Sequence, residues 1–192
     1  QRNTYAYVFA VVVAAALTAL ALYTAGYGVE APLVVLALAG VAAVAERSSV
    51  RLTRYTELSI SPLPTLFAAV MFGPAEAALV GAASMLGDPE LVSGSSHRAP
   101  RLKWAAYTST RFITGALTGL AAQAVILLVP SEFGGLILAT LVGAIISETL
   151  EIVFAVIALA ARGGPVRDVA QTMVPLLVLA PPIYAPIVAL LA

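Results

Sequence analysis

The chain has 192 residues, of which 61% are hydrophobic and only 10% are charged, and its formal net charge is zero. Soluble domains carry about 25% charged residues, so this composition predicts an integral membrane protein, and the zero net charge gives no basis for nucleic-acid binding. The sequence has no cysteine and one histidine, His97, which excludes disulfides, iron–sulfur clusters and multi-histidine metal sites, and we expect no cofactor.

Apolar segments follow one another along the chain. The first, residues 5–25, is long enough to span a bilayer, and it is too long to be the core of a cleavable signal peptide. The second, residues 31–45, has a proline in its first turn, where the missing N–H has no helical partner to lose. The remaining segments are residues 62–72, 74–87, 102–129, 133–161 and 173–192. We therefore predict a single all-α integral membrane domain over residues 1–192, a polytopic bundle of about six to seven hydrophobic helices.

Residues 62–72 and 74–87 are each shorter than the ~20 residues that a straight helix needs to cross a bilayer. The step Gly73-Pro74 separates them, and the residue before a proline is disfavoured in the α-helical region. Irregular backbone at membrane depth survives only where protein or water satisfies its polar groups. We expect a short broken helical hairpin over residues 62–87 that doubles back beside a polar cavity.

The two long segments carry ionisable residues at membrane depth, namely Arg111, Glu148 and Glu151. Arg111 lies roughly twenty residues before the turn between the two segments and Glu151 roughly twenty after it, so at ~1.5 Å per residue both reach the same depth. Glu148 lies one helical turn from Glu151. Each charge costs ~2.5–3.5 kcal/mol in the membrane, so an Arg111–Glu151 or Arg111–Glu148 pair is expected in the interior.

One arginine cannot neutralise two carboxylates. Either one glutamate is protonated, or a second cation reaches the pair. That cation could come from Arg51, Arg54 or Arg98, or from a bound ligand. The alternative is an internal salt bridge that joins two helices and binds nothing.

A polar loop, residues 46–61, precedes the broken hairpin. Arg51, Arg54 and Glu57 could line the mouth of a cavity and bind an anionic head group. The alternative is that these arginines only meet lipid phosphates at the interface.

Basic residues follow a pattern that bears on membrane topology. If residues 62–87 form a hairpin that returns to its own side, all the basic segments lie in the cytoplasm, as the positive-inside rule requires. If that segment crosses the membrane once, at least one basic loop lies outside. The basic segments are Arg2, residues 47–54, residues 98–103 and residues 162–167, whereas residues 26–31 and 130–135 contain no arginine or lysine.

Three short motifs in residues 42–88 carry a family resemblance: Ser59-Ile60-Ser61-Pro62, Phe72-Gly73-Pro74 and Gly87-Asp88. This ordered set resembles the second and third helices of the substrate-binding S components of energy-coupling-factor vitamin transporters. With the preceding Glu46-Arg47, it is more similar to the related membrane sensor domain that precedes bacterial cyclic-dinucleotide and histidine-kinase signalling modules. Residues 104–174 resemble both more loosely.

The resemblance implies that Ser59 and Ser61 contact a ligand, although both could instead cap the following helix. It also supports the hairpin. S components, however, place the loop before this hairpin outside the cell, whereas the positive-inside rule places it in the cytoplasm.

The leading hypothesis is a small-molecule or lipid-binding domain in the bacterial cytoplasmic (inner) membrane, crossing it several times and acting as the sensor or input module of a signalling protein. Its expected partners are the ligand, membrane lipids and a downstream signalling domain. The runner-up is an S component for vitamin or solute uptake, working with transporter subunits. A third alternative is a structural subunit of a membrane complex.

We expect no enzymatic activity, because no known catalytic motif is present and Glu148 and Glu151 have no nucleophile or metal beside them in the sequence. No metal-binding or catalytic residues are therefore predicted. The predicted ligand-binding residues are Arg51, Arg54, Glu57, Ser59, Ser61, Arg111, Glu148 and Glu151.

Overall fold

A computed structural model describes residues 2–48, 50–51, 57–88, 100–164, 166–167, 171, 175, 182 and 186–191. The predicted all-α bundle is confirmed. Its helices are α1 (Arg2–Thr24), α2 (Pro32–Arg47), α3 (Pro62–Met71), α4 (Pro74–Ser84), the short 3-10 helix η1 (Met85–Gly87), α6 (Pro100–Leu128) and α7 (Glu132–Ala161). Two very short strands, β1 (Val50–Arg51) and β2 (Glu57–Leu58), pair antiparallel between α2 and α3.

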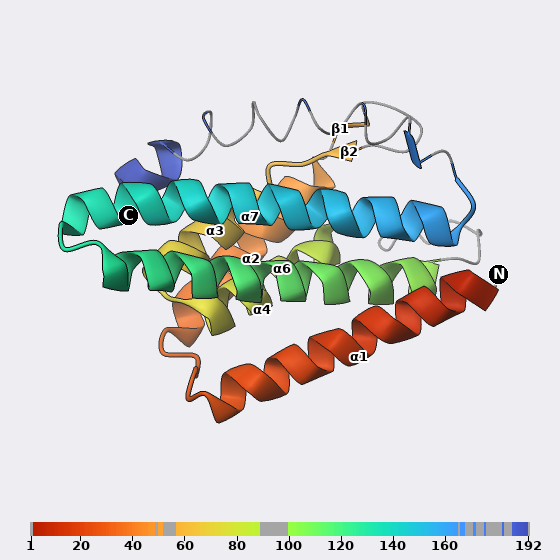
Figure 1. The fold of residues 1–192 in the computed structure, drawn as a ribbon, viewed down its shortest axis with the longest axis horizontal. Helices are drawn as coiled ribbons and strands as arrows, with labels where there is room; N and C mark the ends of the chain where they lie inside the picture. The colour runs from red at the N-terminus through yellow and green to blue at the C-terminus, as the bar shows by residue number, and fades with distance from the viewer. Residues whose placement is uncertain are drawn as a thin grey trace.

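Helix α6 lies at the centre of the bundle, in contact with α1, α3, α4 and α7. Figure 1 shows α6 and α7 running side by side, with α1 crossing below them and the shorter helices α2, α3 and α4 packed behind α6. Consecutive long helices joined by the short turn at residues 129–131 must run antiparallel, as α6 and α7 do.

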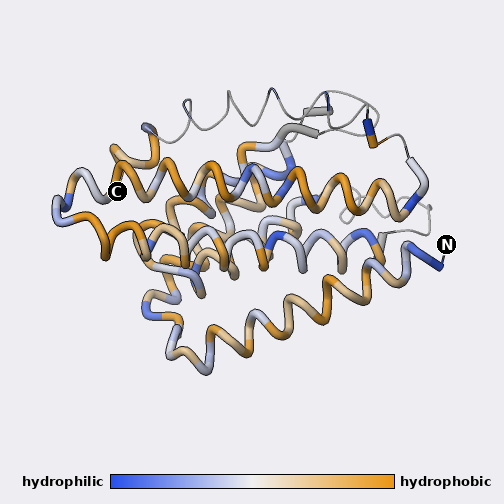
Figure 2. Tube along the Cα trace, in the orientation of Figure 1, coloured by the Kyte–Doolittle hydropathy of each residue, from blue (hydrophilic) through white to orange (hydrophobic). Residues whose placement is uncertain are grey.

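Three of these helices are long and apolar enough to cross a membrane: α1, α6 over Arg101–Leu128, and α7. Figure 2 shows apolar residues along most of α1 and α7, and along α6 mainly toward its connection with α7. Helices α2 and α3, with 16 and 10 residues, are shorter than a straight span. The chain is thus compatible with a membrane protein, although fewer of the described helices are full-length spans than the sequence alone suggested. The predicted helix over residues 173–192 lies mostly outside the described residues.

The predicted hairpin is present. Helix α3 ends at Met71, and α4 begins at Pro74. Gly73, between them, has φ of 113°, a conformation that glycine adopts without steric cost. The two helices double back, because a Cβ built on Gly81 near the end of α4 would lie 3.4 Å from Thr65 Cγ2 near the start of α3.

Glycines bring α4 and α6 into close backbone contact. A Cβ built on Gly115 would lie 2.3 Å from the carbonyl oxygen of Ala77, and one on Gly119 would lie 2.5 Å from Pro74 Cα. The two glycines are four residues apart, the spacing that lets helices approach closely in membranes. Helix α4, the second helix of the hairpin, therefore packs closely against α6.

The connection between α1 and α2 lies beside the turn of the hairpin, at the start of α4. Glu76, which is 1% exposed, accepts a hydrogen bond of 3.0 Å from the backbone N–H of Glu30. Its carboxylate lies in the first turn of α4, where the helix dipole favours negative charge. This hydrogen bond therefore joins the α1–α2 connection to α4, which packs against α6.

Candidate functional site

Arg111 lies within α6, and its guanidinium points toward α7 and the end of α2. Its Nη1 is 3.1 Å from Glu151 Oε1, and its Nη2 is 3.5 Å from Glu46 Oε2. The arginine side chain is only 16% exposed. The predicted Arg111–Glu151 ion pair is therefore confirmed, because equal distances from the α6–α7 turn place both residues at one depth.

Glu46 was not predicted as a partner of Arg111. The sequence interpretation assigned it to a loop, but α2 continues to Arg47, and this helical extension turns Glu46 inward, where it is 9% exposed. A carboxylate in the last turn of a helix faces the negative end of the helix dipole. That unfavourable position is the signal that could have indicated a buried cation nearby.

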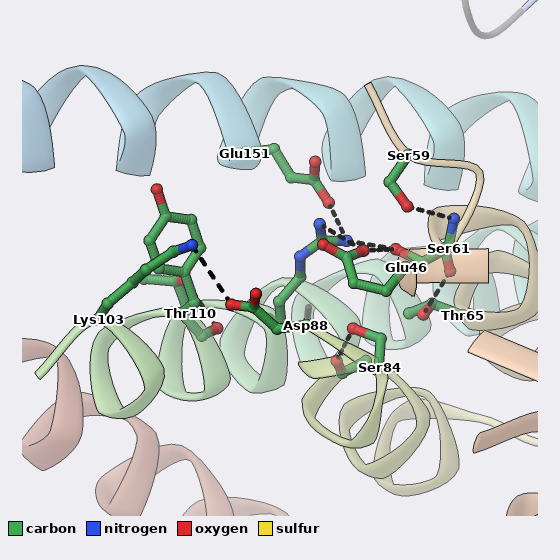
Figure 3. A network of polar contacts seen from close by, with 12 residues as sticks. Glu46, Ser59, Ser61, Thr65, Ser84, Asp88, Lys103, Thr110 and Glu151 are labelled. Atoms are coloured by element: carbon green, nitrogen blue, oxygen red, sulfur yellow. Dashed lines mark hydrogen bonds and ion pairs between the residues drawn. The ribbon is translucent and has the colours of Figure 1, made fainter. Parts of the chain in front are cut away.

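Ser61 joins the two charges. Its hydroxyl donates to Glu46 Oε2 over 2.5 Å and accepts from Arg111 Nη1 over 3.1 Å. Its backbone N–H donates to the hydroxyl of Ser59, and its carbonyl accepts from the hydroxyl of Thr65. Figure 3 shows Ser61 between Glu46 and the start of α3.

The proposal that Ser61 merely caps α3 is wrong. Ser61 occupies the N-cap position, yet its side chain makes no capping hydrogen bond, because the hydroxyl is directed toward Glu46 and Arg111. An N-cap side chain accepts from the second or third helical N–H, but the N–H of Leu63 already donates to the carbonyl of Ile60, and Pro64 has no N–H. The serine is fully buried, at 0% exposure, so its role lies in the charged network.

Glu148 adds a third carboxylate near the same arginine. It lies one turn before Glu151 on α7 and interacts electrostatically with Arg111. The ion pairs described for Arg111 are those with two carboxylates, Glu46 and Glu151. The side chain of Glu151 is 28% exposed, against 12% for Glu46, so the cluster is more open on its α7 side.

A second ion pair lies next to this cluster (Figure 3). Lys103 Nζ is 3.3 Å from Asp88 Oδ2 and 5.7 Å from the centre of the Tyr107 ring. Asp88 follows η1 directly, as expected for a helix-end residue. This pair ties the end of the hairpin to the first turn of α6.

The structure describes Arg51 and Glu57 by their backbone alone, as Cα partners in the register of the β1–β2 ladder. Their predicted role at the site therefore stays a prediction. Arg54 and Arg98 lie outside the described residues. Within the described part of the chain, no group of three or more histidine, aspartate or glutamate residues is arranged to hold a metal ion.

Replacing Ser61 with alanine tests the network. We expect Ser61→Ala to lower the free energy of unfolding by ~1–3 kcal/mol, because a buried carboxylate loses a donor. The measurement is unfolding of the purified protein in mixed detergent micelles, followed by circular dichroism. The control is Ser48→Ala, since Ser48 is exposed and its hydroxyl donates to the carbonyl of Val44 in the helix that it follows. Equal effects of the two substitutions would contradict the prediction.

Comparison of the chain with protein-family models, with curated proteins and with solved structures finds no match. Any function assigned to the chain therefore rests on its sequence and on the geometry of the charged cluster.

Proposed function

We propose that this chain is a membrane-embedded domain that binds a small molecule or a lipid where Glu46, Ser61, Arg111 and Glu151 meet. The observation that carries the proposal is the convergence of charged groups from α2, α6 and α7, with a serine from the start of α3, inside a largely apolar bundle. Ionisable side chains at membrane depth are costly. Apolar side chains of similar volume often stabilise such a junction at least as well, so a role beyond packing is favoured.

The charge balance favours a ligand that carries a positive group. Glu46 and Glu151 both contact Arg111, and Glu148 lies within electrostatic range. Within these two ion pairs, the carboxylates of Glu46 and Glu151 share one guanidinium, which is an excess of one negative charge. A protonated amine on the ligand would reduce that excess, and the partly exposed side of Glu151 is where the cluster is most open.

The biological setting is inferred from the resemblance of the hairpin motifs. A ligand-binding domain that crosses the bacterial inner membrane several times would act as the input module of a signalling protein. The alternative is an S component that delivers a solute to transporter subunits. Both use a broken hairpin beside a polar site, and α3, Gly73 and α4 support that arrangement here.

A structural role is the second candidate, and a specific observation favours it. Arg111 is already paired with Glu151 and Glu46, and the hydroxyl of Ser61 has both a donor and an acceptor partner. The same cluster could therefore hold α2, α3, α6 and α7 together without any ligand. In that case the domain would serve as a subunit of a membrane complex.

Native mass spectrometry of the detergent-extracted protein separates the two candidates. We expect a bound small molecule or lipid on the wild-type chain, and its loss in the double variant Glu148→Gln with Glu151→Gln. The amide keeps the shape of each side chain and removes its charge, so the bundle should remain folded. Glu132→Gln is the matched control, because Glu132 lies exposed at the start of α7, away from the cluster.

Retention in the double variant equal to that of the wild type would remove α7 from the site. A wild-type chain that carries no ligand would favour the structural role. Gel filtration and a thermal unfolding curve of each variant show whether any loss of ligand reflects unfolding.

A further inference from the structure

The basic residues of the chain gather at one end of the bundle. The start of α1 lies beside the end of α7, because Thr4 donates a hydrogen bond of 3.5 Å to the carbonyl of Ala161 and Tyr7 donates one of 3.3 Å to the carbonyl of Phe154. Val8 and Val11 also pack against Ala106, near the start of α6. The termini of three long helices therefore meet at this end.

Helix α2 also runs toward this end. Gly87 packs against the backbone of Ala43, near the end of α2, and the next residue, Asp88, pairs with Lys103 on α6. The helix ends at Arg47, which is exposed. We define the basic end by its described residues, which are Arg2, Arg47, Arg101, Lys103, Arg162 and Arg167.

The opposite end carries acidic residues in place of basic ones. Its connections are residues 25–31 between α1 and α2 and residues 129–131 between α6 and α7, and their neighbourhood contains Glu30 and Glu132. The hydrogen bond from the Glu30 N–H to Glu76 places the α1–α2 connection beside the Gly73 turn. Gly73 in turn lies close to Gln123 of α6. Figure 1 shows both connections at the same side of the bundle, far from the N-terminus. We define this as the acidic end.

We infer that the basic end lies at the cytoplasmic face of the membrane and binds the anionic head groups of that leaflet, with the acidic end outside. Arginine and lysine are retained on the cytoplasmic side during insertion. The cytoplasmic leaflet is also negatively charged and attracts exposed basic side chains. Arg2, Arg47, Arg101, Arg162 and Arg167 are all exposed. The hairpin makes this orientation self-consistent, because α3 and α4 leave the basic side and return to it.

The orientation sets the side from which the proposed site is reached. Arg111 lies about 16 Å from the start of α6 and about 26 Å from its end, at ~1.5 Å per residue. The cluster of Glu46, Arg111 and Glu151 is therefore in the cytoplasmic half of the membrane. A ligand would reach it from that leaflet. The inference itself rests on membrane insertion and does not depend on a bound ligand.

Single-cysteine labelling tests the orientation, and the chain has no native cysteine to remove. Gly28→Cys reports the acidic end, where a Cβ has nothing within 4 Å. Asn3→Cys and Ser48→Cys report the basic end, since both residues are exposed. With a membrane-impermeant maleimide, we expect Gly28→Cys to be labelled in right-side-out membrane vesicles and protected in inside-out ones. Asn3→Cys and Ser48→Cys should show the reverse.

The opposite labelling pattern, or equal labelling of all three variants in both kinds of vesicle, would overturn the orientation. Lipid binding is tested by native mass spectrometry after addition of phosphatidylglycerol or phosphatidylcholine. We expect Arg101→Gln with Arg162→Gln to lose phosphatidylglycerol adducts relative to the wild type, and Glu132→Gln to keep them. Unchanged adducts in the arginine variant would overturn the head-group contact.

Discussion

Replacing Arg111 with leucine is expected to cause the largest loss of stability of any single substitution in the charged cluster. The change leaves the buried carboxylate of Glu46 and the partly exposed one of Glu151 without their cation, and removal of one partner from a buried ion pair costs ~3–5 kcal/mol. That is a large part of the ~5–15 kcal/mol that holds a typical domain folded. The measurement is the free energy of unfolding from a denaturant or detergent titration of the purified protein.

Two further substitutions at Arg111 sharpen this test. Arg111→Lys should recover only part of the loss, because an ammonium is a single point charge and cannot present a planar fork to two carboxylates. Arg111→Leu combined with Glu46→Gln and Glu151→Gln should recover more, because the uncompensated charges are gone. The control is Arg162→Gln, at an exposed position after α7. If Arg111→Leu and Arg162→Gln had similar effects, the buried network would not contribute to stability.

Gly115→Ala is expected to have the second-largest effect, although it adds only one methyl group. A Cβ at Gly115 would lie 2.3 Å from the carbonyl oxygen of Ala77 and 2.6 Å from its carbonyl carbon. Overpacking a core costs ~1–3 kcal/mol, and the upper part of this range is expected because the obstructing atoms are backbone. Relief requires α4 to move away from α6, which would also displace the hairpin beneath Arg111.

Gly40→Ala is the matched control for Gly115→Ala. Gly40 lies inside α2, and a Cβ there would have nothing within 4 Å. Alanine is favoured over glycine in a helix interior by ~0.8–1 kcal/mol, so this substitution should raise the free energy of unfolding. The prediction fails if the two substitutions change stability in the same direction and by the same amount.

The two expected losses have different consequences for ligand binding. Arg111→Leu removes a side chain that would face the ligand, so retention and stability should fall together. Gly115→Ala changes no polar group, so any loss of ligand must result from movement of the hairpin. A comparison of retention with stability for both variants therefore tells a charge effect from a positional one.

The long helices and the break between α3 and α4 could be predicted from the order of the residues. Apolar runs longer than a bilayer thickness predict α1, α6 and α7, and Gly73-Pro74 predicts a turn, because these rules depend only on neighbours along the chain. Counting from one turn was enough to pair Arg111 with Glu151, since antiparallel helices joined by a short loop keep a fixed register.

The contacts of two further residues with this pair could not be predicted from the sequence and depend on the tertiary structure. Glu46 and Ser61 lie 65 and 50 residues before Arg111, and no local rule sets the distance between their elements. The sequence also did not show that Gly115 is the residue of α6 that contacts α4, because many faces of an alanine-rich helix have equally small side chains. Helix formation is a local property of the chain, whereas the packing of α3 and α4 against α6, and of α2 against α3 and α4, depends on how all their surfaces fit together at once.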